Sequence, residues 1–281
     1  MKRCTRQNPC RICGKDGWCC YTDEGLAHCM RVDDAPEGWK VASRSPNGAT
    51  NFLPEGFVQR EARVEPKPGP MKPVVDWDGL NRKFYESCSF DLADKLAQEL
   101  ELNADDLRMV GLGYAPGHDA FTFPMFDAKN RACGIRLRSR TTNKKYAIKG
   151  SSDGVFGIPL PCPEGRPILV CEGPTDTAAM IQVGFYAYGR PSCRGAVITT
   201  KTLTKGRDVV IVSDSDSPGR AGAAALADAL HRTCSSVRII EPLKGKDARE
   251  WVASGATKDI VEFTINQAKE CCGNEVQSIE A

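Results

Sequence analysis

The sequence predicts an α/β protein in which a small cysteine-rich module comes first, an α+β region follows, and a domain with a mainly parallel sheet comes last. Three observations support this prediction. Cysteines are concentrated in residues 9–31, four prolines lie in residues 59–73, and apolar runs alternate with helix-like segments from residue 167 onward. Such alternation is typical of a parallel sheet covered by helices.

Composition limits the class of protein before any motif is considered. The chain has 281 residues, of which 41% are hydrophobic and 26% are charged, and its formal net charge is +2. These values are typical of a globular protein and favour no class of partner. No stretch approaches the ~20 apolar residues that cross a membrane. The first ten residues are not followed by the apolar run of a signal peptide. The sequence therefore predicts a cytoplasmic protein with no membrane partner.

The close spacing of several cysteines near the N-terminus predicts a zinc site. Cys10 and Cys13 form a C-x2-C pair that a glycine follows, and such a turn points two thiolates at one ion. Residues 18–21 and 26–30 are expected to form a hairpin that supplies the other two ligands. The predicted zinc ligands are Cys10, Cys13, Cys19 and Cys29.

Two alternatives to this ligand set stay open. Cys19 and Cys20 point to opposite faces of the predicted strand, so one of them is expected to bind the ion. His28 is a reserve ligand. A metal-free, reduced module is disfavoured, because so short a segment has too little aliphatic content to fold without a staple. Elsewhere the isolated cysteines are predicted to be small core residues: Cys88, Cys133, Cys162, Cys171, Cys193 and Cys234.

The segment at 59–73 has alternating charge as well as prolines, so it is predicted to be a linker. The predicted organisation is a zinc ribbon at 1–58, a linker at 59–75, a basic subdomain at 76–160, a domain with the parallel sheet at 161–270, and a polar tail at 271–281.

Periodicity predicts the elements after the linker. Apolar residues at three- and four-residue spacing predict helices within 76–110, and apolar–polar alternation predicts antiparallel strands at 120–127, 132–140 and 145–150. Beyond residue 167, strands are predicted at 168–171, 196–199, 208–214 and 236–240. Helices are predicted at 175–183, 220–230 and 247–255.

Acidic residues follow two of the predicted strands. Glu172 ends the run ILVC, and Asp214 and Asp216 follow DVVIVS. Neighbouring parallel strands lie ~4.8 Å apart, so carboxylates at their ends can share a divalent cation, and oxygen ligands favour Mg²⁺ or Mn²⁺. Asp176, one helical turn beyond Glu172, could join them or cap the helix. The alternative is that the aspartates only cap helices and form turns.

These motifs resemble a known domain. CEGPTD and SDSD resemble the acidic motifs of the Toprim domain, which primases, topoisomerases, some nucleases and recombination mediators share. LKGKDAREW, with Lys246 and Asp247, is similar to the G-K-D segment of primases. Upstream, FPMFDAKNRACGIRLRS, KKYAIKGS and FGIP resemble the basic subdomain that precedes the Toprim domain in DnaG-like primases. The order of zinc ribbon, basic subdomain and Toprim domain covers almost the whole chain.

Residues 129–149 contain eight basic residues and no acidic one. Arg136, Arg138 and Arg140 alternate along one strand and are expected to share a face, which can bind a phosphate backbone or a triphosphate. The alternative is a solvated sheet edge that charge protects. The resemblance implies that Arg136, Arg138 and Lys145 hold nucleotide and template, and Lys149 is included in this predicted set.

The resemblance implies a DNA-dependent RNA primase of phage or mobile-element type, without a fused helicase. Glu172, Asp214 and Asp216 would hold Mg²⁺, and Asp176, Lys246 and Asp247 would complete the catalytic set. The implied partners are single-stranded DNA, ribonucleoside triphosphates and a helicase in trans, and a monomer is expected.

Two alternatives stay open. A Toprim nuclease would use the same acids to hydrolyse a phosphodiester. A non-catalytic DNA-binding recombination mediator would place its zinc motif close before the Toprim domain, whereas more than a hundred residues intervene here.

Overall fold

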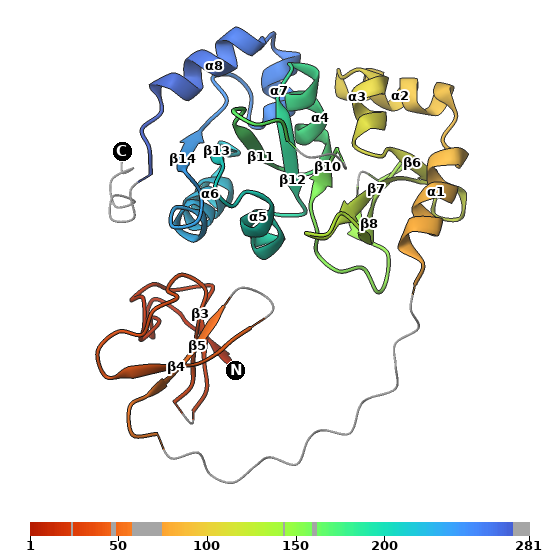
Figure 1. The fold of residues 1–281 in the computed structure, drawn as a ribbon. Helices are drawn as coiled ribbons and strands as arrows, with labels where there is room; N and C mark the ends of the chain where they lie inside the picture. Colours follow the sequence, from red (N-terminus) through yellow and green to blue (C-terminus); the bar gives the residue numbers. More distant parts are fainter. Residues whose placement is uncertain (24, 46–48, 58–74, 143, 159–161, 272–281) are drawn as a thin grey trace. The chain divides into compact units, whose positions relative to one another are not determined.

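The computed structural model describes residues 1–23, 25–45, 49–57, 75–142, 144–158 and 162–271 (Figure 1). The chain divides into two compact units, Met1–Val74 and Val75–Ala281. The predicted linker at 59–75 lies outside the described residues except for Val75, and the predicted tail at 271–281 lies outside them except for Cys271. The finer boundary at 160/161 stays a prediction.

The smaller unit is built on a five-stranded antiparallel sheet with the order β1-β2-β3-β5-β4. The strands are β1 (Lys2–Arg3), β2 (Cys20–Tyr21), β3 (Ala27–Cys29), β4 (Trp39–Arg44) and β5 (Thr50–Pro54). Strands β2 and β3 form the predicted hairpin. The buried cluster beneath the sheet consists mainly of cysteines, with Ala27 and Phe52 beside them. The described residues of this unit therefore bury almost no aliphatic side chain in that cluster.

The larger unit begins with three helices and a four-stranded antiparallel sheet with the order β6-β7-β8-β9. The elements are α1 (Trp77–Ser87), α2 (Phe90–Leu100), α3 (Ala104–Met109), β6 (Gly113–Ala115), β7 (Ala120–Phe126), β8 (Ala132–Ser139) and β9 (Lys145–Ala147). Both long helices begin at capping residues, because Asp76 and Ser89 each accept a hydrogen bond from a backbone N–H of the first turn.

The two faces of this small sheet have different partners. Ile135 and Leu137 of β8 pack with Phe84 of α1. Phe121 and Phe123 of β7 lie on the opposite face and belong to the main core, which also contains residues of α2, α3 and α4. Since paired residues of antiparallel strands share a face, Arg136 and Arg138 of β8 lie on the side of Phe121 and Phe123. The basic strand therefore faces the second half of the unit.

The second half contains a five-stranded sheet with the order β10-β12-β11-β13-β14, in which β10 is antiparallel and the other strands are parallel. Its strands are β10 (Phe156–Gly157), β11 (Ile168–Glu172), β12 (Tyr186–Arg190), β13 (Asp208–Val212) and β14 (Ser236–Ile240). Its helices are α4 (Pro174–Gln182), α5 (Val197–Leu203), α6 (Ser217–Leu230), α7 (Ala248–Ala253) and α8 (Lys258–Gln267).

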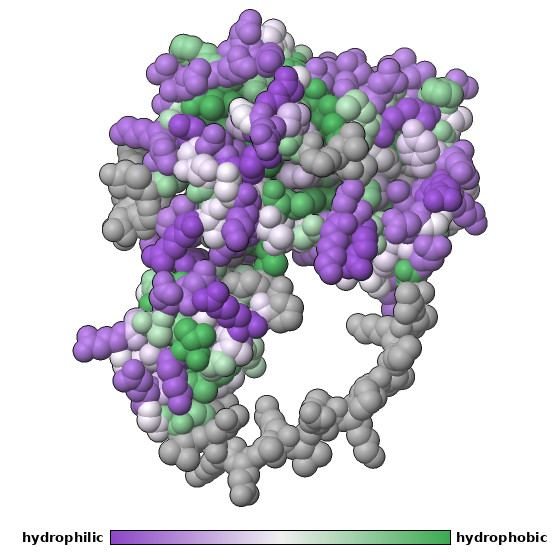
Figure 2. Space-filling view, in the orientation of Figure 1, coloured by the Kyte–Doolittle hydropathy of each residue, from purple (hydrophilic) through white to green (hydrophobic). Residues whose placement is uncertain are grey.

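Helices cover this sheet, which confirms the predicted α/β class. Leu169 and Val210 pack with residues of α4 and α7 in the main core, including Trp251. Helix α6 contacts β13 and β14 (Figure 1). Helical surfaces of the larger unit that are visible in Figure 2 are mainly hydrophilic. Among the described residues, no helix combines the length and the apolar character of a membrane-spanning segment.

The predicted strand at 196–199 is wrong. This segment begins helix α5, and the strand that completes the sheet is β12, which the sequence analysis missed. Apolar runs of four residues do not distinguish a strand from a helix. Ala196 adopts the left-handed conformation with φ 52°, which starts the helix, and the Thr200 hydroxyl donates to the Ala196 carbonyl at 2.8 Å. Tyr186 and Tyr188 of β12 are buried, as residues of a central strand are.

We expect Gly189→Ala to destabilise the larger unit. A methyl group at Gly189 of β12 would overlap the Thr177 hydroxyl and would lie 2.5 Å from the Gly173 carbonyl oxygen. The free energy of unfolding should fall by about 1–3 kcal/mol, as overpacking of a core does. Chemical denaturation measures it. Gly117→Ala is the matched control, because a methyl group there meets nothing within 4 Å. Equal stability of the two variants would contradict the close approach of α4 to β12.

Candidate functional site

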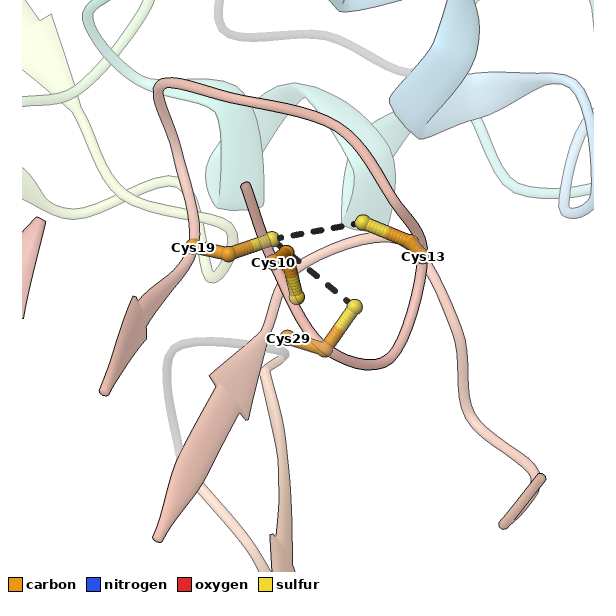
Figure 3. Close-up of side chains that lie close together, drawn as sticks. All are labelled: Cys10, Cys13, Cys19 and Cys29. Carbon is orange, nitrogen blue, oxygen red and sulfur yellow. Dashed lines mark hydrogen bonds between the residues drawn. The ribbon is translucent and has the colours of Figure 1, made fainter. Parts of the chain in front are cut away.

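Four thiols converge in the smaller unit. The sulfur atoms of Cys10, Cys13, Cys19 and Cys29 all lie within 4.8 Å of one another (Figure 3). The Sγ–Sγ distance is 3.7 Å between Cys13 and Cys19 and 3.8 Å between Cys19 and Cys29. Tetrahedral zinc with Zn–S bonds of ~2.3 Å separates its sulfur ligands by about 3.8 Å. The donor set and its spacing therefore fit a structural zinc ion.

Local backbone geometry explains why these thiols meet. The Gly14 N–H donates to the Cys10 carbonyl at 2.8 Å, and Gly14 adopts a φ of 72° that favours glycine, so the chain turns sharply after Cys13. The hairpin of β2 and β3 supplies Cys19 and Cys29. Hydrogen bonds from neighbouring thiols, with Cys13 first, lower the pKa of Cys10. Hydrogen bonds from neighbouring thiols, with Cys10 first, raise the pKa of Cys19 and Cys29, so only part of the cluster favours thiolate, the form that binds metal.

The structure separates the alternative ligands from this cluster. Cys20 lies outside it. The His28 ring places Nδ1 2.7 Å from Oδ1 of Asn51, its cross-strand partner. A residue that the sequence analysis missed is Arg31, whose Nη1 donates to the sulfurs of Cys13 at 3.8 Å and Cys19 at 3.6 Å.

The second candidate site is the edge of the parallel sheet where its strands end. Glu172 is the last residue of β11, and Asp214 lies two residues beyond β13. Asp216 caps α6 by accepting from the Gly219 N–H at 2.7 Å, and Asp247 caps α7 by accepting from the Glu250 N–H at 2.8 Å. These two aspartates therefore do cap helices, which was the alternative to metal binding in the sequence analysis. Each cap uses the Oδ1 atom, and Oδ2 of Asp247 lies 3.9 Å from Nη2 of Arg249.

Burial and mutual repulsion show that these acids form one electrostatic group. Asp176 is only 7% exposed, and burial followed by the charge of Asp247 raises its pKa to about 8. Burial followed by the charges of Glu172 and Asp247 raises the pKa of Asp214 to about 7. Lys145 of β9 acts in the opposite direction and lowers the pKa of both aspartates. The basic strands and the acidic edge therefore lie close enough to interact.

The carboxylates are less tightly grouped than the thiols. In the ranges that the structure describes, the four cysteines are the set of three or more metal-ligand side chains whose atoms come within 4.8 Å of one another. At the acidic edge, a small cavity of about 20 Å³ is lined in part by Glu172, Arg190, Cys193 and Asp214. A cavity of this size holds about one water molecule. A Mg²⁺ or Mn²⁺ site here stays a prediction.

The predicted basic residues share a surface but differ in their partners. Arg136 donates to the Pro191 carbonyl at 2.9 Å, and Arg138 forms an ion pair with Glu99 of α2 at 2.8 Å. Arg140 pairs with Asp119 at 3.2 Å, beyond the end of β8. Lys145 and Lys149 are exposed. The arginines are therefore held in place from both halves of the unit, and the lysines extend into solvent.

Lys246 lies beside the acidic edge without pointing at an aspartate. Its side chain is 70% exposed, and its Nζ pairs with Glu250 at 3.2 Å. Its carbonyl accepts from the Ser215 N–H at 2.8 Å, which brings the loop after β14 next to Asp214 and Asp216. Whether Lys246 belongs to the catalytic set therefore stays a prediction.

Two arginines near the acids were not singled out from the sequence. Arg190 pairs in register with Glu172 at the ends of β12 and β11, and it is 4% exposed. Arg249 donates its backbone N–H to Asp176 at 3.1 Å, and its guanidinium contacts the Leu100 carbonyl at the end of α2. Arg190 could have been found had β12 been recognised, since it ends that strand as Glu172 ends β11.

Comparisons with known proteins were made by sequence and by structure. No protein-family model and no curated protein matches the sequence. Solved structures match the fold. The DnaG primase catalytic domain bound to single-stranded DNA is 20% identical, with a TM-score of 0.57 over 69% of this chain and 78% of that one.

Two further matches agree with this result. The catalytic core of the E. coli primase is 19% identical, with a TM-score of 0.57 over 69% of this chain and 79% of that one. The zinc-binding and RNA polymerase domains of the Aquifex aeolicus primase are 17% identical, with a TM-score of 0.58 over 70% of this chain and 60% of that one. The chain therefore has the fold of DnaG primase catalytic cores.

We expect Cys19→Ser and Cys20→Ser to differ sharply. Cys19 lies in the thiol cluster and Cys20 does not. Cys19→Ser should lose bound zinc and unfold the smaller unit, because metal binding supplies the folding free energy of such modules. Cys20→Ser should keep about one zinc ion per chain. Zinc release to a colorimetric chelator and circular dichroism measure the two effects. Full zinc retention by Cys19→Ser would refute the assigned ligand set.

We expect the acidic edge to lower the stability of the magnesium-free protein as the pH rises. Asp214 has a folded pKa of about 7, above the ~3.9 of an unfolded aspartate. Its stabilising contribution is therefore complete below about pH 4 and is lost as the pH rises through 7. Asp214→Asn removes this loss, so its melting temperature should exceed that of the wild type at pH 8 and match it near pH 4. The exposed Asp153→Asn is the control. If the melting temperatures of Asp214→Asn and Asp153→Asn fall by the same amount as the pH rises, the raised pKa of Asp214 is contradicted.

Proposed function

We propose that the protein is a DNA-dependent RNA primase that synthesises short primers on single-stranded DNA. The observation that carries the proposal is that basic and acidic groups meet in one unit: Arg136 of β8 donates to the Pro191 carbonyl at 2.9 Å, directly after Arg190, which pairs in register with Glu172. Such an arrangement suits a reaction that joins anionic substrates beside metal-binding carboxylates. The fold shared with primase catalytic cores supports the same function.

The basic sheet is the proposed site of the template and of the incoming triphosphate. Arg136, Arg138 and Lys145 lie on one face, and Lys149 follows β9. Arginine binds phosphate through two parallel hydrogen bonds, and lysine acts as a mobile positive charge. A solved primase structure bound to single-stranded DNA supports a DNA template here.

The acidic edge is the proposed site of Mg²⁺ or Mn²⁺. Glu172, Asp214 and Asp216 would hold the ion, and Asp176, Lys246 and Asp247 would surround them. When bound, the ion would neutralise charge on the transferred phosphoryl group and lower the pKa of the attacking 3′-hydroxyl. Burial of Asp176 and Asp214 makes both carboxylates costly to ionise alone, so the site favours a cation.

The smaller unit is proposed to hold a structural zinc ion and to contact the template. Its four thiols fit zinc, and a primase structure that includes a zinc-binding domain matches the fold. Replication of DNA would place the protein in the cytoplasm of a bacterial host. A replicative helicase in trans and a monomeric state complete the proposal.

The first test is primer synthesis. Zinc-loaded protein is incubated with single-stranded DNA, labelled ribonucleotides and Mg²⁺, beside the variants Glu172→Gln and Glu164→Gln. Wild type should produce short labelled oligomers. Glu172→Gln should lose at least about a hundredfold in rate, because it removes a metal ligand. Glu164→Gln changes an exposed glutamate in the loop before β11 and should behave as the wild type.

The same experiment distinguishes the other functions. Degradation of the template that depends on Glu172, without oligomers, would establish a nuclease. DNA binding without either activity, also when a replicative helicase is added, would favour a recombination mediator. Either result would overturn the primase proposal.

A further inference from the structure

The loop between β12 and α5, residues 191–196, lies directly beside the acidic edge. In the parallel pairing of β11 and β12, Glu172 lies opposite Arg190, and the loop begins at the next residue. Ser192 and Cys193 line the same small cavity as Glu172 and Asp214. The loop therefore forms one wall of the site at which the acids meet.

Buried Arg190 fixes the shape of this loop. Its Nε donates to the Gly195 carbonyl at 2.9 Å, and its Nη2 donates to the Cys193 carbonyl at 2.8 Å. Burial lowers its pKa to about 10, and the charge of Glu172 opposes that shift. The guanidinium is thus still positively charged at neutral pH. A buried cation whose bonds go to loop carbonyls both holds the loop and places positive charge behind it.

Two further contacts hold the loop from outside. Arg136 of β8 donates to the Pro191 carbonyl at 2.9 Å. Helix α6 packs against Cys193 so closely that a methyl group at Gly222 would lie 2.5 Å from the Cys193 Cβ. The Gly195 N–H closes a turn onto the Ser192 carbonyl at 3.0 Å. The loop is therefore built to one shape before any substrate binds.

Arg194 stands at the tip of this fixed loop. Its side chain is exposed, and it has no hydrogen-bond or ion-pair partner among the residues that the structure describes. The other arginines around the site are engaged: Arg136 and Arg190 with carbonyls, and Arg138 with Glu99. Arg194 is thus an exposed guanidinium on a loop whose neighbouring residues, Ser192 and Cys193, line one cavity with Glu172 and Asp214.

We propose that loop 191–196 is a binding site for the phosphate groups of the incoming nucleotide, and that Arg194 is the residue that contacts them. This inference rests on the proposed function and deepens it, since the resemblance and the basic strands assigned nucleotide binding to other residues. A nucleoside triphosphate that contacts both Arg194 and a cation at the acidic edge has its negative charge balanced from two sides. The Ser192 hydroxyl, at the start of the same turn, is a second donor within the loop.

Direct nucleotide binding tests the inference. Isothermal titration measures the affinity of a ribonucleoside triphosphate with Mg²⁺ for the full chain. Arg194→Ala should weaken binding by roughly ten- to a hundredfold, the effect of losing a hydrogen bond to a charged group. The affinity of Arg194→Lys should lie between those of the wild type and Arg194→Ala, because lysine keeps the positive charge and loses the paired hydrogen bonds. Arg166→Ala is the matched control, because it removes an exposed arginine from the loop before β11, at the opposite end of the sheet.

Steady-state primer synthesis provides the second measurement. Arg194→Ala should raise KM for the nucleotide by a similar factor, while its affinity for single-stranded DNA, measured by fluorescence anisotropy, should match that of the wild type. If Arg194→Ala binds the nucleotide as tightly as Arg166→Ala does, the inference is overturned. A wild-type chain that binds no triphosphate would also overturn it. A chain that binds triphosphate through Arg194 and makes no primers would overturn the proposed function and leave the phosphate site standing.

Discussion

Repulsion among carboxylates gathered where neighbouring strands of the parallel sheet end is the constraint on which the larger unit depends. Strand β11 lies between β12 and β13, so Glu172 ends a central strand, and it lines one small cavity together with Asp214. Burial and neighbouring charge raise the pKa of Asp176 and Asp214 together. Positive charge surrounds them from several elements: Lys145 from the small sheet and Arg190 from β12. A divalent cation bound there would neutralise the negative charge that these side chains leave uncompensated.

The smaller unit is built on the same principle with sulfur in place of oxygen. Four of the six fully buried apolar residues beneath its sheet are cysteines, and an aliphatic core is missing from the described residues. Without a cation the unit keeps thiols crowded at 3.7–3.8 Å and has little hydrophobic burial to compensate. Both units therefore crowd ionisable groups together: thiols that fit a zinc ion in the smaller unit, and carboxylates at the proposed catalytic site in the larger one.

The sequence alone predicted the features that depend on the spacing of residues close together in the chain. The four cysteines, the hairpin between them, the strands that end in Glu172 and precede Asp214, and the basic strand β8 all follow from spacing and alternation. The missing features depend on contacts between distant residues. Strand β12 was overlooked because the run at 196–199 is the more continuous apolar run, and only pairing with β10 and β11 identifies residues 186–190 as a strand. Arg31, Arg190 and Arg249 were missed because single arginines have no periodic signal. Only the fold shows that they reach sulfur, a loop carbonyl or a buried aspartate.

The bond from Arg136 to the Pro191 carbonyl joins the two proposed substrate surfaces. A guanidinium has a fixed number of N–H groups in one plane, so a template phosphate that draws Arg136 toward it competes with Pro191. Occupancy of the basic strand would then change how firmly loop 191–196 is held. Thermodynamic reciprocity requires that occupancy of the loop would change the affinity for the template by the same factor. If both surfaces bind their proposed ligands, this one hydrogen bond across the unit would couple the binding of template to the binding of nucleotide.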